Sequence, residues 1–132
     1  MELYGENFER LVEDALKHLW EFRRLGRHPF SELEAVHQYL PIDKTPITHL
    51  DRGQALHRWI LRAMEELRQL PSIGDSPEAR YYDILEGEYV KRLKNRNTAE
   101  ALGLSESTFY RTRREAIQCL ADVLAEFEKG HV

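Results

Sequence analysis

Apolar residues recur every three or four positions along most of the chain, which is the repeat of an amphipathic α-helix. No segment alternates apolar and polar residues as a half-buried strand does, and the chain has no internal repeat. The fold class is therefore expected to be all-α. The pattern predicts helices over residues 7–25, 31–40, 51–70 and 78–93, then a short helix from Asn97 and a long last helix from Ser105 to about Lys129.

Glycine, proline and capping residues set the expected helix ends in the first half of the chain. Gly26 should end the first helix as a left-handed cap, with Pro29 soon after it. Ser31 and Glu34 have the S-x-x-E spacing of a capping box, which predicts the start of the second helix. Gly53 weakens the first turn of the third helix by about 1 kcal/mol relative to Ala, so this helix could start later.

Residues 71–77, PSIGDSP, form the only stretch with the composition of a linker. We place a boundary there, between an N-terminal three-helix part (residues 1–70) and a C-terminal part (residues 78–132). The last helix continues as an apolar tail through Val123 and Phe127, beyond the length that a minimal helix-turn-helix needs. This tail must therefore pack against another part of the chain.

Residues 97–120 have the layout of a helix-turn-helix: a short helix, a turn that contains Gly103, and a second helix with Ser105 as its N-cap. One side of the second helix is apolar at spacings of three and four, and it comprises Phe109, Thr112, Ala116, Ile117 and Leu120. The opposite side is polar and basic. This layout is typical of DNA-binding proteins whose second helix enters the major groove.

The opposite side of the second helix supplies the candidate DNA contacts. Arg111 and Arg114 are the best candidates for base recognition, because one guanidinium can bind both acceptors of a guanine. Ser107 and Tyr110 could contact bases or phosphates. The start of the short helix, with Asn97 as its N-cap, should face a phosphate, and the candidate contacts there are Lys94, Arg96 and Thr98. The alternative for the arginines is an ordinary solvated face.

Arg113 differs from the other two arginines because it projects towards the apolar side of its helix. We expect its side chain to be half-buried and paired with a carboxylate, for which Asp83 is the candidate. A DNA contact is the less favoured interpretation of this residue.

Charge is distributed unevenly along the chain. The net charge is −4, from 19 basic and 23 acidic residues, whereas DNA-binding domains are often basic as a whole. Residues 91–114, however, hold seven basic and two acidic side chains, a net +5, which leaves −9 for the remainder. Positive charge is thus concentrated at the helix-turn-helix, which favours contact with DNA phosphates there. A solvated basic surface without a partner would have the same composition.

Composition argues against a membrane protein or a disulfide-rich protein. Hydrophobic residues make up 42% and charged residues 32% of the chain. No apolar run approaches the roughly 20 residues that cross a bilayer, and the acidic start MELYGENFER differs from a basic signal peptide. We expect a cytoplasmic protein without a membrane partner. Cys119 is the only cysteine, which excludes an internal disulfide, and we interpret it as a packing residue of the last helix.

Catalytic and ligand sites have little support in the sequence. The six histidines lack metal-binding spacing, no nucleophile lies beside a base, and no glycine-rich loop could hold a phosphate. We therefore expect neither an enzyme nor a metal, cofactor or small-molecule site. Aromatic residues could form a stacking platform for single strands, but core positions are favoured for most of Tyr4, Trp20, Trp59, Tyr81, Tyr82 and Tyr89.

Residues 82–127, YDILEGEYVKRLKNRNTAEALGLSESTFYRTRREAIQCLADVLAEF, resemble region 4 of bacterial sigma factors. The STFYR and AIQCLA segments are most similar to phage late-transcription regulators of the ArpU and RinA type, and to the N-terminal helix-turn-helix module of some bacterial multidomain signalling ATPases. Residues 15–36, ALKHLWEFRRLGRHPFSELEAV, also resemble the signalling ATPases. Arg96 and Asn97 depart from the less charged start of the short helix in many relatives.

The resemblance implies DNA binding and contact with RNA polymerase. A complete sigma factor is not expected, because no segment resembles the region that melts promoters. We therefore expect a sequence-specific transcriptional regulator or DNA-targeting module that binds double-stranded DNA. The alternative is a helical interaction module that binds RNA polymerase, a second copy of itself or a larger signalling protein, without direct DNA binding.

Overall fold

The computed structural model describes residues 2–69 and 77–130, and every regular element in these residues is helical. The all-α prediction is confirmed. The α-helices are α1 (Gly5–Lys17), α2 (Phe22–Leu25), α3 (Glu34–His37), α4 (His49–Arg68), α5 (Tyr81–Leu85), α6 (Asn95–Ala101) and α7 (Glu106–Gly130). Between them lie two 3₁₀ turns, Pro29–Glu32 and Pro77–Arg80, and one π-helical turn, Glu86–Val90.

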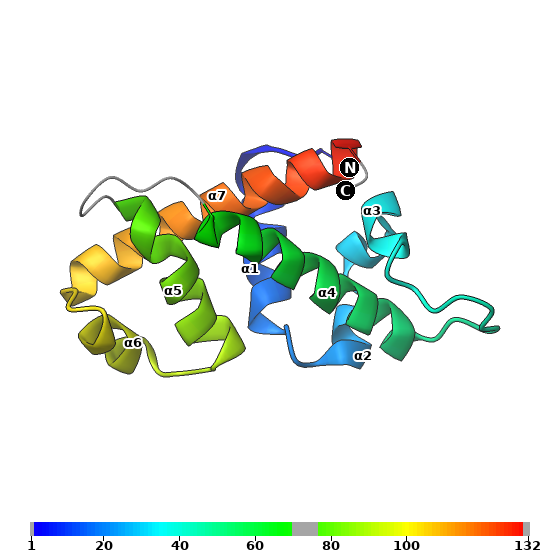
Figure 1. Ribbon diagram of the computed structural model, residues 1–132, viewed down its shortest axis with the longest axis horizontal. Helices are drawn as coiled ribbons and strands as arrows, with labels where there is room; N and C mark the ends of the chain where they lie inside the picture. The colour runs from blue at the N-terminus through cyan, green and yellow to red at the C-terminus, as the bar shows by residue number, and fades with distance from the viewer. Residues whose placement is uncertain (1, 70–76, 131–132) are drawn as a thin grey trace.

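Helix α7 runs from α6 at one end of the molecule to α3 at the other, and it contacts α1, α4 and α5 on the way (Figure 1). The main hydrophobic core joins residues from both sides of residues 70–76, among them Phe8, Trp59 and Leu124, all of which are almost completely buried. The apolar tail of the last helix therefore packs within the same chain. Most of the expected linker, residues 71–76, lies outside the described residues.

The helix predicted over residues 7–25 is interrupted, which the apolar pattern did not indicate. Helix α1 ends at Lys17, and α2 begins at Phe22 after a turn. Contacts with distant elements hold this turn: the Trp20 indole donates to the carbonyl oxygen of Val90 at 3.0 Å, and His57 Nδ1 donates to that of Leu19 at 2.8 Å. Tertiary packing thus overrides the local helical pattern.

Two glycines allow α2 and α4 to cross at close range. A Cβ atom on Gly53 would lie 1.6 Å from the Phe22 carbonyl oxygen, and one on Gly26 would lie 1.9 Å from that of His49. The prediction of a left-handed cap at Gly26 is wrong, since its φ of −65° is right-handed. Helix α4 also begins earlier than expected, at His49, because Thr48 and Asp51 form a capping box.

The second predicted helix, residues 31–40, is much shorter than expected. Ser31 lies within a 3₁₀ turn and is no helix cap, because its Oγ donates to the carbonyl oxygens of Gly26 and His28 at 2.9 and 2.8 Å. Helix α3 begins only at Glu34. Its first amide groups, those of Glu34 and Ala35, donate to the carboxylate of Glu128 near the end of α7, at 3.2 and 3.1 Å. A residue far along the chain therefore caps α3.

The helix predicted over residues 78–93 is helical only to Val90, and its last turn is a π-helix. The amide of Lys91 donates to the Glu86 carbonyl oxygen at 2.8 Å, which closes the wider turn. Within this turn Gly87 lies against Thr98 of α6, where an added Cβ would be 2.9 Å from the Thr98 methyl group. The π-helical turn thus brings α5 and α6 together.

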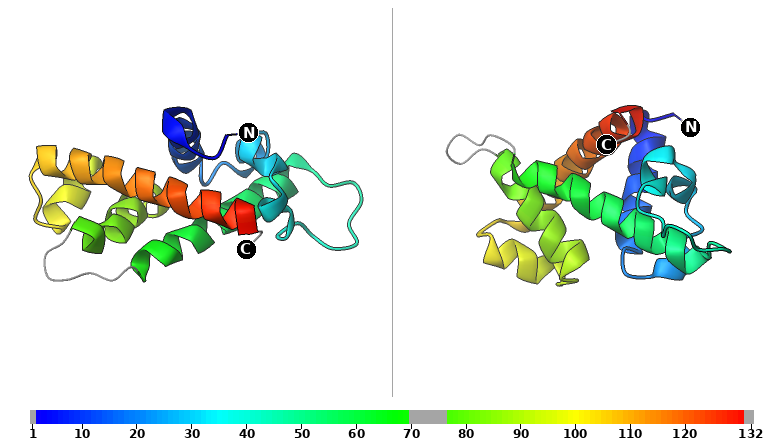
Figure 2. Two further views of the ribbon diagram at one scale, coloured as in Figure 1. Left: turned by 90° about the horizontal axis from the view of Figure 1, so that it is seen from above. Right: turned by 45° about the vertical axis from the view of Figure 1, so that its right-hand side comes forward.

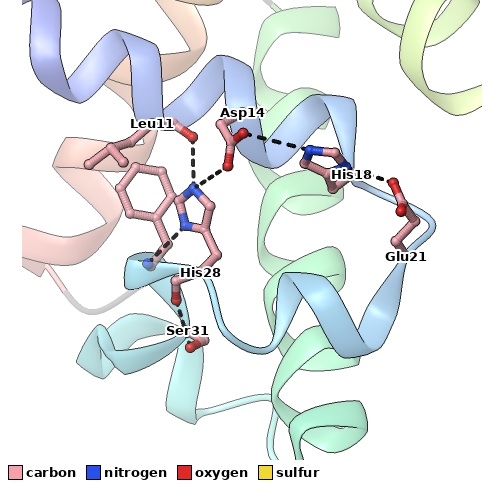
Figure 3. A network of polar contacts seen from close by, with 7 residues as sticks. Leu11, Asp14, His18, Glu21, His28 and Ser31 are labelled. Carbon is pink, nitrogen blue, oxygen red and sulfur yellow. Dashed lines mark hydrogen bonds and ion pairs between the residues drawn. The ribbon is translucent and has the colours of Figure 1, made fainter.

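A buried histidine ties the middle of α1 to the first 3₁₀ turn (Figure 3). His28 Nε2 donates to the Leu11 carbonyl oxygen at 3.0 Å, and its Nδ1 accepts from the Phe30 amide at 3.0 Å. Asp14 lies 3.6 Å from His28 and also 3.6 Å from His18. Burial lowers the pKa of His28, although the Leu11 carbonyl and Asp14 oppose this shift. The neutral imidazole is the form that fits both hydrogen bonds.

The free energy of unfolding should fall when the pH is lowered from about 7.5 to 5, through the ordinary histidine pKa of about 6.5. Burial lowers the pKa of both His28 and His57, so the unfolded chain binds protons at a higher pH than the folded chain. The free energy of unfolding that the two neutral histidines contribute is fully present above the pKa of the unfolded chain. It is lost as the pH falls through the lower pKa of the folded chain. Urea unfolding at the two pH values measures the change, which should shrink in His28→Gln. A stability that stays constant or rises towards pH 5 would contradict this assignment.

Candidate nucleic-acid interface

Helices α5, α6 and α7 form a small three-helix unit with its own core. Ile84, Ala99 and Phe109 are buried together, and Leu102 and Leu104 pack against them. The turn between α6 and α7 is a Schellman motif, in which the amides of Gly103 and Leu104 donate to the carbonyl oxygens of Glu100 and Ala99 at 3.1 and 2.9 Å.

Gly103 occupies the left-handed position of this turn, with φ of +69°. The turn therefore joins α6 to α7 through a short left-handed connection.

The two predicted N-caps have different outcomes. The Ser105 hydroxyl accepts from the Thr108 amide at 3.3 Å, as an N-cap of α7 should. Asn97 is not the N-cap of α6, because this helix already begins at Asn95 and Lys94 is its N-cap residue. Asn97 lies within the first turn instead, where its side chain is exposed.

One face of the first half of α7 is exposed to solvent, and its four side chains are the predicted DNA contacts of this helix: Ser107, Tyr110, Arg111 and Arg114. We call these residues the exposed stripe. The opposite face is buried as the apolar spacing predicted, with Phe109, Thr112, Ala116, Ile117 and Leu120 all 6% exposed or less. The packed side thus holds the exposed stripe in a defined orientation.

Arg111 and Arg114 make no hydrogen bond and no ion pair with any residue of the described part of the chain. Both guanidinium groups stand in solvent one turn apart on the same face. Each therefore keeps all its N–H donors available for an external acceptor.

The Arg113 side chain, which lies between Arg111 and Arg114 in sequence, is partly buried and is bound by other residues of the chain. Its guanidinium lies 2.6 Å from the carboxylate of Glu88, and both side chains are largely shielded, at 22% and 12% exposure. It also lies over the ring of Tyr110 at 5.0 Å. The expected half-buried ion pair is present, but the expected partner is wrong, because Glu88 of the π-helical turn takes the place of Asp83, which is exposed on α5.

Asn95, at the start of α6, connects this ion pair to the exposed stripe. Its amide nitrogen donates to the Glu88 carboxylate, and its amide oxygen accepts from the Tyr110 hydroxyl at 3.3 Å. Burial raises the pKa of Glu88, and the adjacent Arg113 opposes that shift. Glu88 and Asn95 were missed from the sequence, because no spacing relates a residue of the π-helical turn to one of α7.

The three candidates at the start of α6 fall into two classes. Lys94 and Arg96 are exposed, and Arg96 forms a surface ion pair with Glu100 at 3.2 Å. A pair of this kind contributes about 0–1 kcal/mol, so a phosphate can replace Glu100 at little cost. Thr98 is only 3% exposed and its hydroxyl donates to the Lys94 carbonyl oxygen at 3.4 Å. This burial argues against Thr98 as a phosphate contact.

Metal-binding clusters and membrane-spanning helices are absent from the described residues. No group of three or more His, Cys, Asp or Glu side chains in residues 2–69 and 77–130 could hold a metal ion. Across the same residues, no helix has both the length and the apolar character needed to span a membrane. Cys119 is half-buried on α7, and burial raises the pKa of its thiol. Trp59, Tyr81 and Tyr89 lie in the core, whereas Tyr4 and Trp20 are exposed.

Comparison of the chain with protein-family models, with curated proteins and with solved structures gave no significant match.

Truncation should lower the free energy of unfolding more at the paired Arg113 than at the exposed Arg111. Arg113→Ala leaves the Glu88 carboxylate largely buried without its cation, which should cost about 1–3 kcal/mol of unfolding free energy. Arg111→Ala removes an exposed side chain that has no ion pair within residues 2–69 and 77–130, and it should cost less than about 0.5 kcal/mol. Urea unfolding of both variants tests this division. Equal losses of unfolding free energy in the two variants would contradict a stabilising Arg113–Glu88 ion pair.

Proposed function

We propose that this protein binds duplex DNA by placing the first half of α7 in the major groove. One observation carries the proposal: Arg111 and Arg114 are exposed and unpaired within the described residues, on a helix whose other face is buried. An exposed cation without an internal partner is free to bind an external anion or a base edge. The rigid support of α7 means that little ordering is needed on binding.

The dimensions and chemistry of the exposed stripe suit the major groove. From Ser107 to Arg114 the helix rises by about 10 Å, and the major groove is about 12 Å wide and admits an α-helix. Each guanidinium can bind the O6 and N7 atoms of a guanine, with a discrimination of about 1–3 kcal/mol per contact. Lys94 and Arg96, exposed at the start of α6, are proposed to bind phosphates and so fix the position of the protein on the duplex.

A role in transcription follows from the resemblance to sigma region 4, and it is part of the same proposal. A protein that reads promoter DNA beside RNA polymerase would act in the cytoplasm of a bacterium or in a phage-infected cell. The resemblance also includes the helix-turn-helix modules of signalling ATPases, for which the function would be to target a larger protein to DNA. Both forms use the same surface of α7.

The second candidate is a protein-interaction module, and exposed apolar residues outside the helix-turn-helix favour it. Ile42 is 87% exposed in the loop before α4, and Trp20 is 43% exposed. Under this alternative, RNA polymerase or a second copy of the chain would cover these side chains. The apolar tail of α7 does not add to this candidate, because it is already buried within the chain.

The test is binding to a pool of random-sequence duplexes of about 20 base pairs, followed by titration of the enriched sequence. The wild type should enrich a defined sequence, and log Kd should depend linearly on log salt concentration. Arg111→Ala combined with Arg114→Ala should lower the preference for that sequence over random DNA at least about tenfold. The matched control is Arg27→Ala with Arg58→Ala, two exposed arginines without an ion pair in the described residues and outside α7.

Equal sequence preference in the wild type and the Arg111/Arg114 variant would contradict the proposal. Absence of DNA binding at about 50 mM salt, together with elution as a tight oligomer, would favour the interaction module instead.

A further inference from the structure

A groove of about 420 Å³ lies between α1 and α7, directly beside the exposed stripe. Its two walls differ in charge. The wall from α1 is acidic apart from Arg10, and the wall from α7 is basic and aromatic, with the lining residues Glu6, Glu9, Arg10 and Glu13 on one side and Tyr110, Arg113 and Arg114 on the other. Two members of the exposed stripe therefore line a groove whose opposite wall carries carboxylates.

The acidic wall is only partly neutralised by its own helix. Glu6 pairs with Arg10, and Glu13 pairs with Lys17, each at 3.5 Å across one exposed helical turn. Within the described residues Glu9 has no ion pair, and its side chain is partly buried in the groove wall. Helix α1 holds four acidic and two basic residues, a net −2, so the wall remains negative.

The position of α1 brings this negative charge close to any duplex on the exposed stripe. Helices α1 and α5 pack against α7 from opposite sides (Figure 2). The exposed stripe, on which DNA would lie, is on the unpacked side of α7, and α1 borders it at Tyr110 and Arg114. Phosphates at this end of the duplex would lie near the carboxylates of the groove, and charges interact over the Debye length of about 8 Å at physiological salt.

We propose that the acidic wall of α1 is a built-in electrostatic brake on DNA binding. The inference rests on the proposed function and adds its regulation. Glu6, Glu9 and Glu13 repel the phosphate backbone, and they also attract the Arg114 guanidinium that the duplex needs. Both effects weaken DNA binding at low salt and disappear as salt screens the charges. Covering or neutralising this wall would release the exposed stripe for DNA.

The experiment compares two triple variants of the full chain that change net charge equally. In the first, Glu6→Gln, Glu9→Gln and Glu13→Gln remove the acidic wall. In the control, Glu32→Gln, Asp122→Asn and Glu126→Gln remove three acidic groups elsewhere. The sets match in type, since Glu32 and Glu126 are also in surface ion pairs and Asp122, like Glu9, has none in the described residues. Asp122 and Glu126 lie about 12 and 18 Å beyond Arg114 along α7.

Affinity for a random-sequence duplex of about 20 base pairs is measured by fluorescence anisotropy at about 50 mM and 300 mM salt. The groove variant should bind about tenfold more tightly than the wild type at the lower salt, and the gain should fall to about twofold or less at the higher salt. The control variant should gain about twofold or less at both. Glu9→Gln alone, which leaves both ion pairs of α1 intact, should give part of the gain.

Three outcomes are decisive. A groove variant that binds no more tightly than the control, in a chain that does bind DNA, overturns the brake and leaves the proposed function standing. Absence of binding in all variants overturns the proposed function and the brake with it. Should the triple variant fail to fold in urea unfolding, Glu9→Gln decides the question, and an affinity equal to the wild type overturns the brake.

Discussion

The burial of one continuous face of α7 is the constraint on which the rest of the structure depends. The start of this helix packs on α5 and α6, its end packs on α3, and it also contacts α1 and α4. Phe109 and Leu124, which are fully buried, belong to different hydrophobic clusters but to the same helix. Because α7 is rigid from Glu106 to Gly130, the orientation of its exposed stripe is set by the core of the whole chain.

The three arginines of α7 show how this constraint separates an internally paired side chain from exposed ones. Arg113 faces the packed side and is neutralised by Glu88 at 2.6 Å, with Asn95 connecting the pair to Tyr110. Arg111 and Arg114 face solvent and are left without an ion pair in the described residues. The proposed brake follows the same logic, since the carboxylates of α1 stand across the groove from Arg114. Under the proposed function, an acidic protein would in this way carry a local DNA-binding surface whose affinity its own carboxylates lower.

Sequence periodicity predicted what depends on local pattern, and it missed what depends on distant contacts. The all-α class, the buried face of α7 and the Ser105 cap follow from spacings within one helix. The break after Lys17 does not, because Trp20 stops the helix by bonding to Val90, which is 70 residues away. The partner of Arg113 was assigned wrongly for the same reason, because Glu88 in the π-helical turn, 25 residues away in sequence, forms the ion pair instead of Asp83. The burial of Thr98 also required the close approach of Gly87.

The most direct test of the central claim is an NMR titration of the ¹⁵N-labelled chain with a short duplex of an enriched sequence. Backbone amide and arginine side-chain signals report which surface meets the DNA. The largest shifts are expected at Ser107, Tyr110, Arg111 and Arg114, with smaller shifts at the start of α6. Shifts confined to the loop before α4, or no shifts at any concentration of duplex, would contradict the claim that α7 reads DNA.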